Sequence, residues 1–335
     1  MEEDHTMIEN VSFIVIARNE EFAVDRCLRS FLSMPLANCE ILAIDSDSTD
    51  GTLDIIKSYA AENPIVSVFR CTGYVNAAVA RNVGLDRAQK KYICFSDGDT
   101  EWTADFVRES LRVMEAGEAD AVTGGLTHQV YSSSYDRVLE TRTRGLPASR
   151  RSVSYCGGNS IMRKAVADAV GSWDERLMRN EDIDYTLRVS RYGRLIALPA
   201  CMGTHHTQRY EERVWKCFRD RQIRFHGALL RKNLGRPKAL AELVLKKSPG
   251  FLFGYVFYAL FSAWIVTSVV TAEPQVPFAV GLLAFVALDV ILGLLRGDGV
   301  LKRLVTHYCY PSSVLCGFVL GAGRRPAATV VEEVH

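Results

Sequence analysis

The regular alternation of short apolar runs with helical patterns constrains the fold of this chain more than any other feature of its sequence. Four short runs rich in β-branched residues have the pattern of buried strands, at residues 11–17, 40–45, 65–69 and 92–96. Helical patterns follow the first three runs, at about 20–34, 52–61 and 74–90. Strands that alternate with helices form βαβ units, so we expect an α/β fold with a mostly parallel central sheet flanked by helices. Further strands are expected at 119–124, about 153–162 and 194–198.

Three of the four expected strands end in polar, mostly acidic clusters. These clusters are Arg18-Asn19-Glu20, Asp45-Ser46-Asp47 and Asp97-Gly98-Asp99. Ligands of parallel sheets bind at the carboxyl ends of the strands, so we expect the clusters to line one site. Two carboxylates one residue apart on a tight turn suit Mg²⁺ or Mn²⁺. A solvated turn is the alternative for such a pair alone, but its place beside other acidic strand ends favours a metal site.

A long apolar region follows the α/β part of the chain. Residues 248–272 are 25 residues without a charge, long enough to span a bilayer. Residues 276–295 form a second apolar stretch that a single acidic residue interrupts, so the two stretches predict a transmembrane hairpin. A third stretch at 304–323 carries His307 and Pro311. Three arrangements stay open for it: a span, a re-entrant segment or an interfacial helix.

The intervening region, residues 206–247, is strongly basic. Residues 209–247 hold twelve Lys or Arg against four acidic residues. Aromatic and aliphatic side chains lie among these cations, which predicts basic amphipathic helices on an anionic membrane surface, Tyr210–Lys232 in particular. The short loop between the two apolar stretches has no basic residue, so the α/β domain is expected on the cytosolic side of the cell membrane. The formal net charge of the whole chain is only +1, which does not favour a nucleic-acid partner.

Six segments of the α/β part, in their order along the chain, resemble the motifs of the inverting family 2 glycosyltransferases, which have the GT-A fold. The segments are Ile14-Val15-Ile16-Ala17-Arg18-Asn19-Glu20, Asp45-Ser46-Asp47-Ser48-Thr49-Asp50-Gly51-Thr52, Ala80-Arg81-Asn82-Val83-Gly84, Phe95-Ser96-Asp97-Gly98-Asp99, Gly157-Gly158-Asn159-Ser160 and Asn180-Glu181-Asp182-Ile183-Asp184-Tyr185-Thr186-Leu187-Arg188. Each segment is moderately specific, and the ordered set is highly specific. The resemblance implies a GT-A nucleotide-sugar-binding domain at 8–205, before the basic region at 206–247 and the membrane region at 248–323.

The same resemblance implies roles for residues that would bind the nucleotide of the donor. Ala17, Glu20, Asp45 and Asp47 would line the nucleoside pocket, because a carboxylate there can accept a hydrogen bond from a base N–H or from ribose hydroxyls. Arg81 would approach the nucleotide or its phosphates. A surface ion pair is the alternative for this arginine.

Other matching residues would bind the metal. Asp97 would face the ribose and the metal, and Asp99 would be the main ligand of Mg²⁺ or Mn²⁺. His205 or His206 would complete the metal shell, as a downstream histidine does in some related enzymes. The alternative for this pair of histidines is an exposed or purely structural place in a loop.

Asp182 is the candidate general base, because an acceptor hydroxyl must lose its proton as it attacks. Repulsion between Asp182 and its neighbours Glu181 and Asp184 can raise a carboxylate pKa. The alternative is a group of helix N-terminal carboxylates that the helix dipole favours. Gly158, Asn159 and Glu181 are expected to lie close to the donor sugar or the acceptor.

These assignments predict transfer of one sugar from a UDP- or GDP-sugar to a hydroxyl of a membrane-presented, lipid-linked saccharide in polysaccharide or glycan assembly. The Gln-x-x-Arg-Trp element of processive synthases is absent from the sequence, which favours single transfer. The alternatives are a polyprenyl-phosphate sugar synthase, similar to dolichyl-phosphate mannose synthase, and a noncatalytic membrane scaffold. The polar stretch 127–152 is either a loop over the site or an ordinary exposed connection.

Overall fold

The computed structural model describes residues 6–208, 222–247, 251–272, 275–295, 304–323 and 328–334. The chain divides into two compact units. The first contains the residues up to 213 together with those from 324 onward, and the second contains residues 214–323. The part of the expected amphipathic helix that precedes residue 222 lies outside the described residues.

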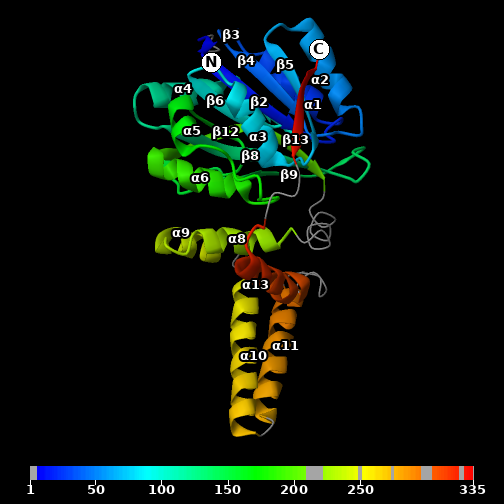
Figure 1. Ribbon diagram of the computed structural model, residues 1–335, viewed down its shortest axis with the longest axis vertical. Helices are drawn as coiled ribbons and strands as arrows, with labels where there is room; N and C mark the ends of the chain where they lie inside the picture. The colour runs from blue at the N-terminus through cyan, green and yellow to red at the C-terminus, as the bar shows by residue number, and fades with distance from the viewer. Residues whose placement is uncertain are drawn as a thin grey trace. The chain divides into compact units, whose positions relative to one another are not determined.

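A mixed β-sheet forms the centre of the first unit (Figure 1). Its central strands are, in spatial order, β5 (Val66–Gly73), β4 (Glu40–Asp45), β2 (Val11–Ala17) and β6 (Tyr92–Asp97). These strands pair in parallel, as the alternation of strands and helices predicted. The expected α/β class is therefore confirmed, with its parallel part centred on β2.

The rest of the sheet is largely antiparallel, so the sheet as a whole is mixed around its parallel centre. Beyond β6, the strands β11 (Ser160–Arg163), β8 (Ala121–Tyr131) and β12 (Leu195–Gln208) follow in spatial order. β11 runs antiparallel to both of its neighbours, whereas β8 and β12 are parallel. The short strands β7 (Thr100–Trp102), β9 (Val138–Arg144) and β10 (Arg151–Ser152) pair antiparallel with β12, β8 and β12, respectively.

Two of these strands change the interpretation of polar parts of the sequence. The stretch 127–152 contains β9, which is mostly exposed and therefore lacks the apolar pattern of a buried strand. The strand expected at 194–198 continues to Gln208. His205 and His206 consequently lie in a strand, rather than in the loop where an exposed pair was the alternative.

Every residue of β2 is buried, because helices cover both faces of the sheet. Successive side chains of a strand point to opposite faces, and accordingly Phe13 and Val15 belong to one apolar core while Ile14 and Ile16 belong to another. The helices of this unit are α1 (Val24–Leu32), α2 (Thr52–Glu62), α3 (Ala77–Arg87), α4 (Ala104–Glu115), α5 (Lys164–Val170) and α6 (Glu181–Tyr192). Helix α3 lies directly on β2, since a Cβ atom at Gly84 would fall 2.3 Å from Cγ2 of Ile14.

A strand from the far end of the described chain completes the sheet beside β5. β13 (Thr329–Val334), coloured red in Figure 1, pairs antiparallel with β5, from Thr329 opposite Gly73 to Val334 opposite Val68. The pairing leaves β5 with a partner on each side, which protects a strand edge from pairing with other chains. The sequence analysis made no prediction for this segment. Because β13 follows residues 214–323 along the chain, the second unit is an insertion within the first.

The second unit contains the apolar helices. α10 (Phe251–Thr271) and α11 (Val276–Leu295) lie within the two stretches that were expected to form a hairpin. By length and composition, one helix among the described residues, Gly254–Thr271, is sufficient to cross a membrane, and Val276–Leu292 is a shorter apolar helix. Both helices expose large aliphatic side chains, among them Val269, Leu283 and Leu295.

Short helices make up the rest of this unit. They are α8 (Arg224–Lys232), α9 (Pro237–Glu242), η1 (Leu243–Lys247), η2 (Val305–Cys309) and α13 (Tyr310–Leu320). α8 packs against α13, where the Arg231 guanidinium donates a hydrogen bond to the Val319 carbonyl (2.6 Å). The buried Asp289 of α11 pairs with His307 of η2 (2.9 Å), which compensates a carboxylate in an apolar helix.

Candidate active site

The strand ends that carry the acidic clusters are neighbours in the sheet. In the register of the parallel strands, Ala17 of β2 lies opposite Asp45 of β4, and Ile16 lies opposite Asp97 of β6. The Gly98 N–H donates to the Ile16 carbonyl (2.8 Å), so the turn after β6 folds back onto the end of β2. The three acidic clusters therefore meet at one edge of the sheet, as their positions in the sequence predicted.

Asp45 has an unusual environment for a carboxylate. Its side chain is fully buried, and Oδ1 accepts a hydrogen bond from the Ser48 N–H (3.1 Å). Oδ2 is also buried, yet no hydrogen-bond partner is present for it among the described residues. Buried carboxylate oxygens are normally hydrogen-bonded, so this atom fits a site that a ligand donor would complete. Ala17 lies beside Asp45, and its carbonyl accepts the Ser46 N–H.

The loops after β2 and β4 are joined by hydrogen bonds that position the other residues expected in the nucleoside pocket. The Glu20 N–H donates to the Thr52 hydroxyl (2.8 Å), at the start of α2. The Asn19 N–H donates to the Ser48 hydroxyl (3.0 Å). Asp47 adopts a left-handed conformation with φ 58° and forms a half-exposed ion pair with Arg70 (3.2 Å).

Arg81 of α3 is a buried cation that joins two parts of the site. Its Nη2 lies 2.5 Å from Oδ1 of Asp97, and its Nη1 lies 3.1 Å from Oε1 of Glu181. Only 3% of the side chain is exposed. A buried guanidinium requires paired carboxylates, and here they come from the end of β6 and the start of α6. The surface ion pair that was the alternative for Arg81 is therefore wrong.

An aromatic group supports this cation. The guanidinium carbon of Arg81 lies 4.7 Å from the ring centroid of Trp173, a geometry that is favourable for a cation–π contact. Trp173 stacks on Tyr185 of α6 at 4.0 Å, and Phe95 of β6 packs edge-on against Trp173. The backbone N–H of Trp173 donates to the Asn82 side chain (2.8 Å), which ties the tryptophan to α3.

The segment Gly157-Gly158-Asn159 closes over Arg81 and Asp97. A Cβ atom on Gly158 would fall 2.1 Å from Nη2 of Arg81, so a larger residue would displace the guanidinium. Asn159 is buried and accepts a hydrogen bond from the Asp97 N–H (2.8 Å). Its amide nitrogen donates to Oδ2 of Asp97 (3.3 Å). Both oxygens of the Asp97 carboxylate are thus engaged by protein groups.

Asp182 lies in the first turn of α6, next to Glu181. Its Oδ1 accepts a hydrogen bond from the Ile183 N–H (2.8 Å). Its Oδ2 lies 3.9 Å from the Cβ position of Gly157, so the carboxylate faces the glycine segment. The Thr186 hydroxyl donates to the Asp182 carbonyl (2.8 Å) and accepts the Cys156 N–H (3.0 Å), which fixes the helix relative to that segment.

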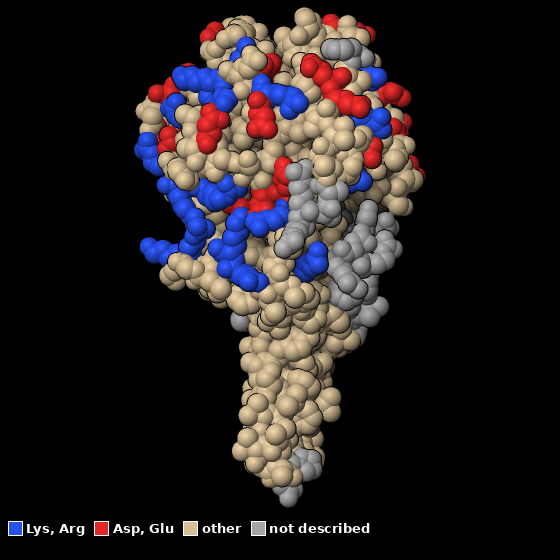
Figure 2. Space-filling view, viewed as in Figure 1, with Lys and Arg blue, Asp and Glu red and all other residues tan. Residues whose placement is uncertain are grey.

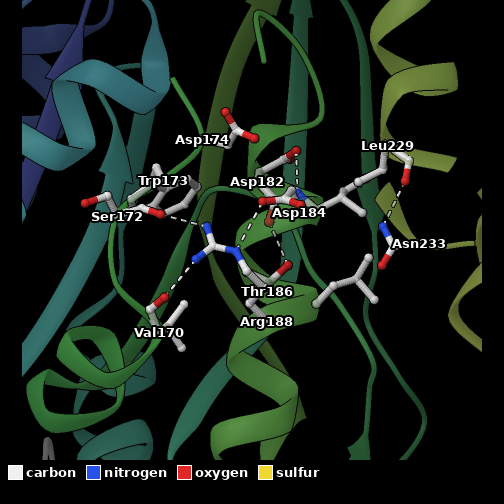
Figure 3. Close-up of polar contacts among 12 residues, drawn as sticks. Val170, Ser172, Trp173, Asp174, Asp182, Asp184, Thr186, Arg188, Leu229 and Asn233 are labelled. Carbon is white, nitrogen blue, oxygen red and sulfur yellow. Dashed lines mark hydrogen bonds and ion pairs between the residues drawn. The ribbon is translucent and has the colours of Figure 1, made fainter. Parts of the chain in front are cut away.

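A second arginine anchors the same helix (Figure 3). Arg188 forms an ion pair with the buried Asp184 (3.2 Å) and donates to the carbonyl groups of Val170 and Ser172 (2.9 and 2.8 Å). Asp184 is therefore a structural carboxylate that pairs with Arg188, and Arg188 connects α6 to the end of α5 and the segment after it. Of the acidic residues in the first turn of α6, Glu181 and Asp182 remain as the candidates for chemistry.

The electrostatic environment of the site raises the pKa of two carboxylates. Burial is the largest cause of the raised pKa of Glu181, which is about 7, and the charge of Asp182 adds to it while Arg81 opposes it. Burial also raises the pKa of Asp97, with Asp99 adding to the rise and Arg81 opposing it. Carboxylates that crowd one site without enough positive charge favour binding of a cation or a proton.

Asp99, in the turn after β6, faces His205 of β12. Nε2 of His205 lies 3.0 Å from Oδ2 of Asp99, and both side chains are nearly buried. His206 turns away: its Nε2 lies 3.2 Å from Glu101 and its Nδ1 lies 3.0 Å from the Tyr131 hydroxyl. His205, rather than His206, is therefore the histidine that could bind the same cation as Asp99.

Two residues that contact candidate site residues, His128 and Trp173, were not predicted from the sequence. Nδ1 of His128 lies 3.0 Å from Nδ1 of His205. Burial, the charge of His205 and two nearby arginines lower the pKa of His128 to about 4. No motif marked either residue, because the residue that each one contacts is distant in the sequence.

We predict that Glu181 makes the stability of the protein depend on pH. Between about pH 4.5, the ordinary value for glutamate, and pH 7, the folded protein keeps a proton that the unfolded chain has released. The free energy of unfolding should therefore fall as the pH rises through this window. Denaturant unfolding of the wild type at several pH values, beside Glu181→Gln, measures the slope.

The glutamine variant should have a clearly smaller slope over the same window. The substitution Glu115→Gln, at an exposed position of α4, provides a matched control that should keep the slope of the wild type. Equal slopes in the wild type and Glu181→Gln would contradict the raised pKa of Glu181.

The first half of the chain resembles known glycosyltransferases. Residues 12–171 match the model of glycosyl transferase family 2. The putative teichuronic acid biosynthesis glycosyltransferase TuaG of Bacillus subtilis is 34% identical over 34% of this chain and 46% of its own length. The amylovoran biosynthesis glycosyltransferase AmsB of Erwinia amylovora is 22% identical over 59% of this chain and 71% of its own length.

A third relative is the UDP-Glc:alpha-D-GlcNAc-diphosphoundecaprenol beta-1,3-glucosyltransferase WfaP of Escherichia coli, which is 34% identical over 32% of this chain. The matched region spans 42% of WfaP, so this chain aligns with less than half the length of WfaP and of TuaG. Among solved structures, TarS 1–349 of S. aureus in complex with UDP-GlcNAc has a TM-score of 0.54 at 17% identity, over 92% of this chain and 89% of that chain. This likeness shows a common GT-A fold. The family match, the relatives and the fold together show that residues 12–171 of the chain form a domain of glycosyl transferase family 2.

Proposed function

We propose that this protein is a metal-dependent, inverting glycosyltransferase that moves one sugar from a UDP- or GDP-sugar to a hydroxyl of a lipid-linked saccharide at a membrane. The observation that carries the proposal is the buried Arg81, which pairs with Asp97 at the end of β6 and with Glu181 at the start of α6. This ion-pair network holds the expected donor-phosphate site next to the expected base. The groups that would bind the leaving diphosphate therefore lie close to the group that would deprotonate the acceptor.

The end of the site formed by β2 and β4 suits the nucleoside of the donor. Asp45 has a buried carboxylate oxygen without a partner among the described residues, and a base N–H or a ribose hydroxyl could be its donor. Ala17 lies beside Asp45, and Glu20 and Asp47 belong to the loops that continue these strands. This arrangement supports their proposed place around the nucleoside, without distinguishing uracil from guanine.

Asp99 and His205 are the proposed protein ligands of Mg²⁺ or Mn²⁺. Their facing oxygen and nitrogen atoms, 3.0 Å apart, fit the donor chemistry of Mn²⁺ well, and Mg²⁺ would rely more on oxygen. The described residues contain no group of three or more metal-ligating side chains. Two protein ligands suit a site in which donor phosphates and water supply the others. A cation there would stabilise the charge of the departing diphosphate, while Arg81 holds Asp97 beside it.

Asp182 is the proposed general base. Its carboxylate faces the segment Gly157-Gly158-Asn159, which packs on Arg81 and Asp97. A hydroxyl that enters between them would give its proton to Asp182 and attack the anomeric carbon from the side opposite the diphosphate. This displacement inverts the anomeric configuration. Gly158, Asn159 and Glu181 would lie near the sugar or the acceptor.

The names of the relatives support the class of acceptor. WfaP is named for transfer of glucose from UDP-Glc to a saccharide on diphosphoundecaprenol. TuaG and AmsB are named for the biosynthesis of teichuronic acid and amylovoran, respectively. A lipid-linked saccharide of this kind offers a hydroxyl nucleophile, which requires a base such as Asp182.

The second unit is the proposed membrane anchor. Because β5 and β13 belong to one sheet, the segment between them must cross a membrane an even number of times. Helices α10 and α11, of 21 and 20 residues, are each about 30 Å long, which matches the apolar thickness of a bilayer. The eleven residues of α13 measure only about 16 Å, so this helix is proposed not to span. The basic residues that precede and follow the apolar helices in the sequence favour a cytosolic location of the catalytic unit.

We predict that Asp182→Asn lowers turnover by a factor of about 10² to 10⁴, because the hydroxyl loses its proton acceptor. Purified full-length protein is assayed against UDP- and GDP-sugars with lipid-linked saccharides, with Mn²⁺, Mg²⁺ or a chelator, and the lipid products are identified by mass. Asp168→Asn, at an exposed position of α5, is the matched control and should keep full turnover.

Two results would contradict parts of this proposal. Retained turnover of Asp182→Asn on polyprenyl phosphate would remove the base assignment and favour the polyprenyl-phosphate sugar synthase. Absence of turnover and of metal-dependent nucleotide binding with every donor would favour the noncatalytic scaffold.

The glycine segment generates a second prediction. Gly158→Ala should lower kcat/KM by roughly 10- to 100-fold, the equivalent of losing a charged hydrogen bond, because the new methyl group displaces Arg81. Gly235→Ala, far from the proposed site in the sequence, is the matched control, since a Cβ atom there would have no neighbour within 4 Å. Equal kinetics of the wild type and Gly158→Ala would show that the position of Arg81 does not limit the reaction.

The proposed topology predicts where inserted epitopes are accessible. A tag placed just before Val276, between α10 and α11, should react with antibody on intact spheroplasts. A tag added after His335 should react only after the membrane is opened, because β13 belongs to the cytosolic unit. Reaction of both tags on intact spheroplasts would contradict an even number of crossings.

A further inference from the structure

We propose that His128 is a positioning residue that holds His205 in the orientation required to bind a divalent cation together with Asp99. This inference rests on the metal-dependent function proposed above and adds a residue that no motif of the sequence marks. His128 acts through His205 and does not bind the cation itself. The evidence is the geometry of three side chains from three separate segments.

The sheet brings the two histidines together. His205 of β12 lies directly opposite His128 of β8 in a parallel register, so both side chains stand on the same face. Their Nδ1 atoms are 3.0 Å apart, and the rings meet edge to face at 81°. The other nitrogen of His205, Nε2, lies 3.0 Å from Oδ2 of Asp99. His205 is therefore held between a neutral hydrogen-bond partner and a carboxylate.

His128 can accept the hydrogen bond that a metal-binding His205 must donate. A histidine that binds a cation through Nε2 must carry its proton on Nδ1, and that N–H needs an acceptor. Nδ1 of His128 is the atom in place to accept it. In the absence of a cation, Nε2 of His205 instead donates to Asp99, and His128 can donate to Nδ1 of His205. The pair therefore allows His205 to change tautomer without turning its ring.

The surroundings of His128 argue against a direct role as a ligand. Arg142 of β9 lies opposite His128 in the antiparallel register, and Arg144 lies two residues further along the same strand. Both arginines disfavour a cation on this side of the ring. The nitrogen of His128 that faces the site is already engaged by His205. These contacts leave His128 the role of orienting its neighbour.

The decisive measurement is the affinity for Mn²⁺, independent of turnover. Purified full-length protein is titrated with Mn²⁺ alone, and then with UDP or GDP present, and free Mn²⁺ is followed by electron paramagnetic resonance. His128→Phe keeps the shape of the ring and removes both nitrogens. Loss of a hydrogen-bond partner of a ligating histidine is expected to raise the Kd for Mn²⁺ about 10- to 100-fold.

One further variant and one further measurement separate positioning from simple loss of structure. His128→Asn places an amide oxygen near the position of Nδ1 and should keep the Kd within a few-fold of the wild type. The thermal midpoint of metal-free His128→Phe should equal that of the wild type within a few degrees. A large fall in this midpoint, together with weak binding by His128→Asn, would make His128 a structural residue and overturn the proposal.

A double-mutant cycle tests whether His128 acts only through His205. His205→Ala should weaken Mn²⁺ binding at least as much as His128→Phe, and the double variant should bind no more weakly than His205→Ala alone. Additive losses would show direct binding by His128, and an unchanged Kd in His128→Phe would show no role. Both results would overturn this inference while leaving the metal-dependent function intact. Failure of the wild type to bind Mn²⁺ under any condition would remove both.

Discussion

The burial of one guanidinium governs the arrangement of the whole site. Arg81 is almost fully enclosed, and an enclosed cation is tolerated only where carboxylates compensate its charge. The two compensating carboxylates, on Asp97 and Glu181, belong to segments that are separated by more than eighty residues of chain. Because both must meet the same flat group, the end of β6 and the start of α6 are fixed relative to each other. The ring of Trp173 and the bare backbone of Gly158 complete the enclosure on its two open sides.

The remaining polar groups divide the edge of the sheet into regions with different chemistry. At the end of β4, the buried Oδ2 of Asp45 has no hydrogen-bond partner among the described residues, which suits a ligand that donates a hydrogen bond. At the turn after β6, Asp99 and His205 form a pair with hard and intermediate ligand atoms. Asp182 stands at the start of a helix that Arg188 and Thr186 hold in place. A reaction with a charged leaving group and a protonated nucleophile needs such separate regions within a few ångströms of one another.

The parallel half of the fold can be predicted from the sequence, because it is encoded locally. The strands near Ile14, Ile44 and Phe95 are buried on both faces and are therefore continuously apolar, and polar residues mark their ends. The same signal placed Ala17, Asp45 and Asp97 at one edge of the sheet. The antiparallel half gives no such signal, since strands with a solvated face, such as Val138–Arg144, resemble polar connections.

Side-chain partners across the sheet were beyond prediction for a related reason. Arg81 and Glu181, or His128 and His205, are brought together by register and helix placement, which the local pattern of neither partner contains. The motif around Arg81 indicated its general location but not its burial. The sequence did not show which of His205 and His206 faces Asp99. In the structure both lie in one continuous strand, so their side chains point in opposite directions and only His205 faces Asp99.

The strand Thr329–Val334 has a consequence for how the protein is made. A ribosome synthesises the apolar helices before it synthesises this strand, so the sheet stays incomplete at β5 until those helices have left the ribosome. An exposed strand edge favours pairing with other chains, and it disappears only when the last segment returns to the sheet. Chain order therefore makes synthesis of both helices precede completion of the sheet. A nascent chain stalled before that return would leave the edge of β5 open to pairing with other chains.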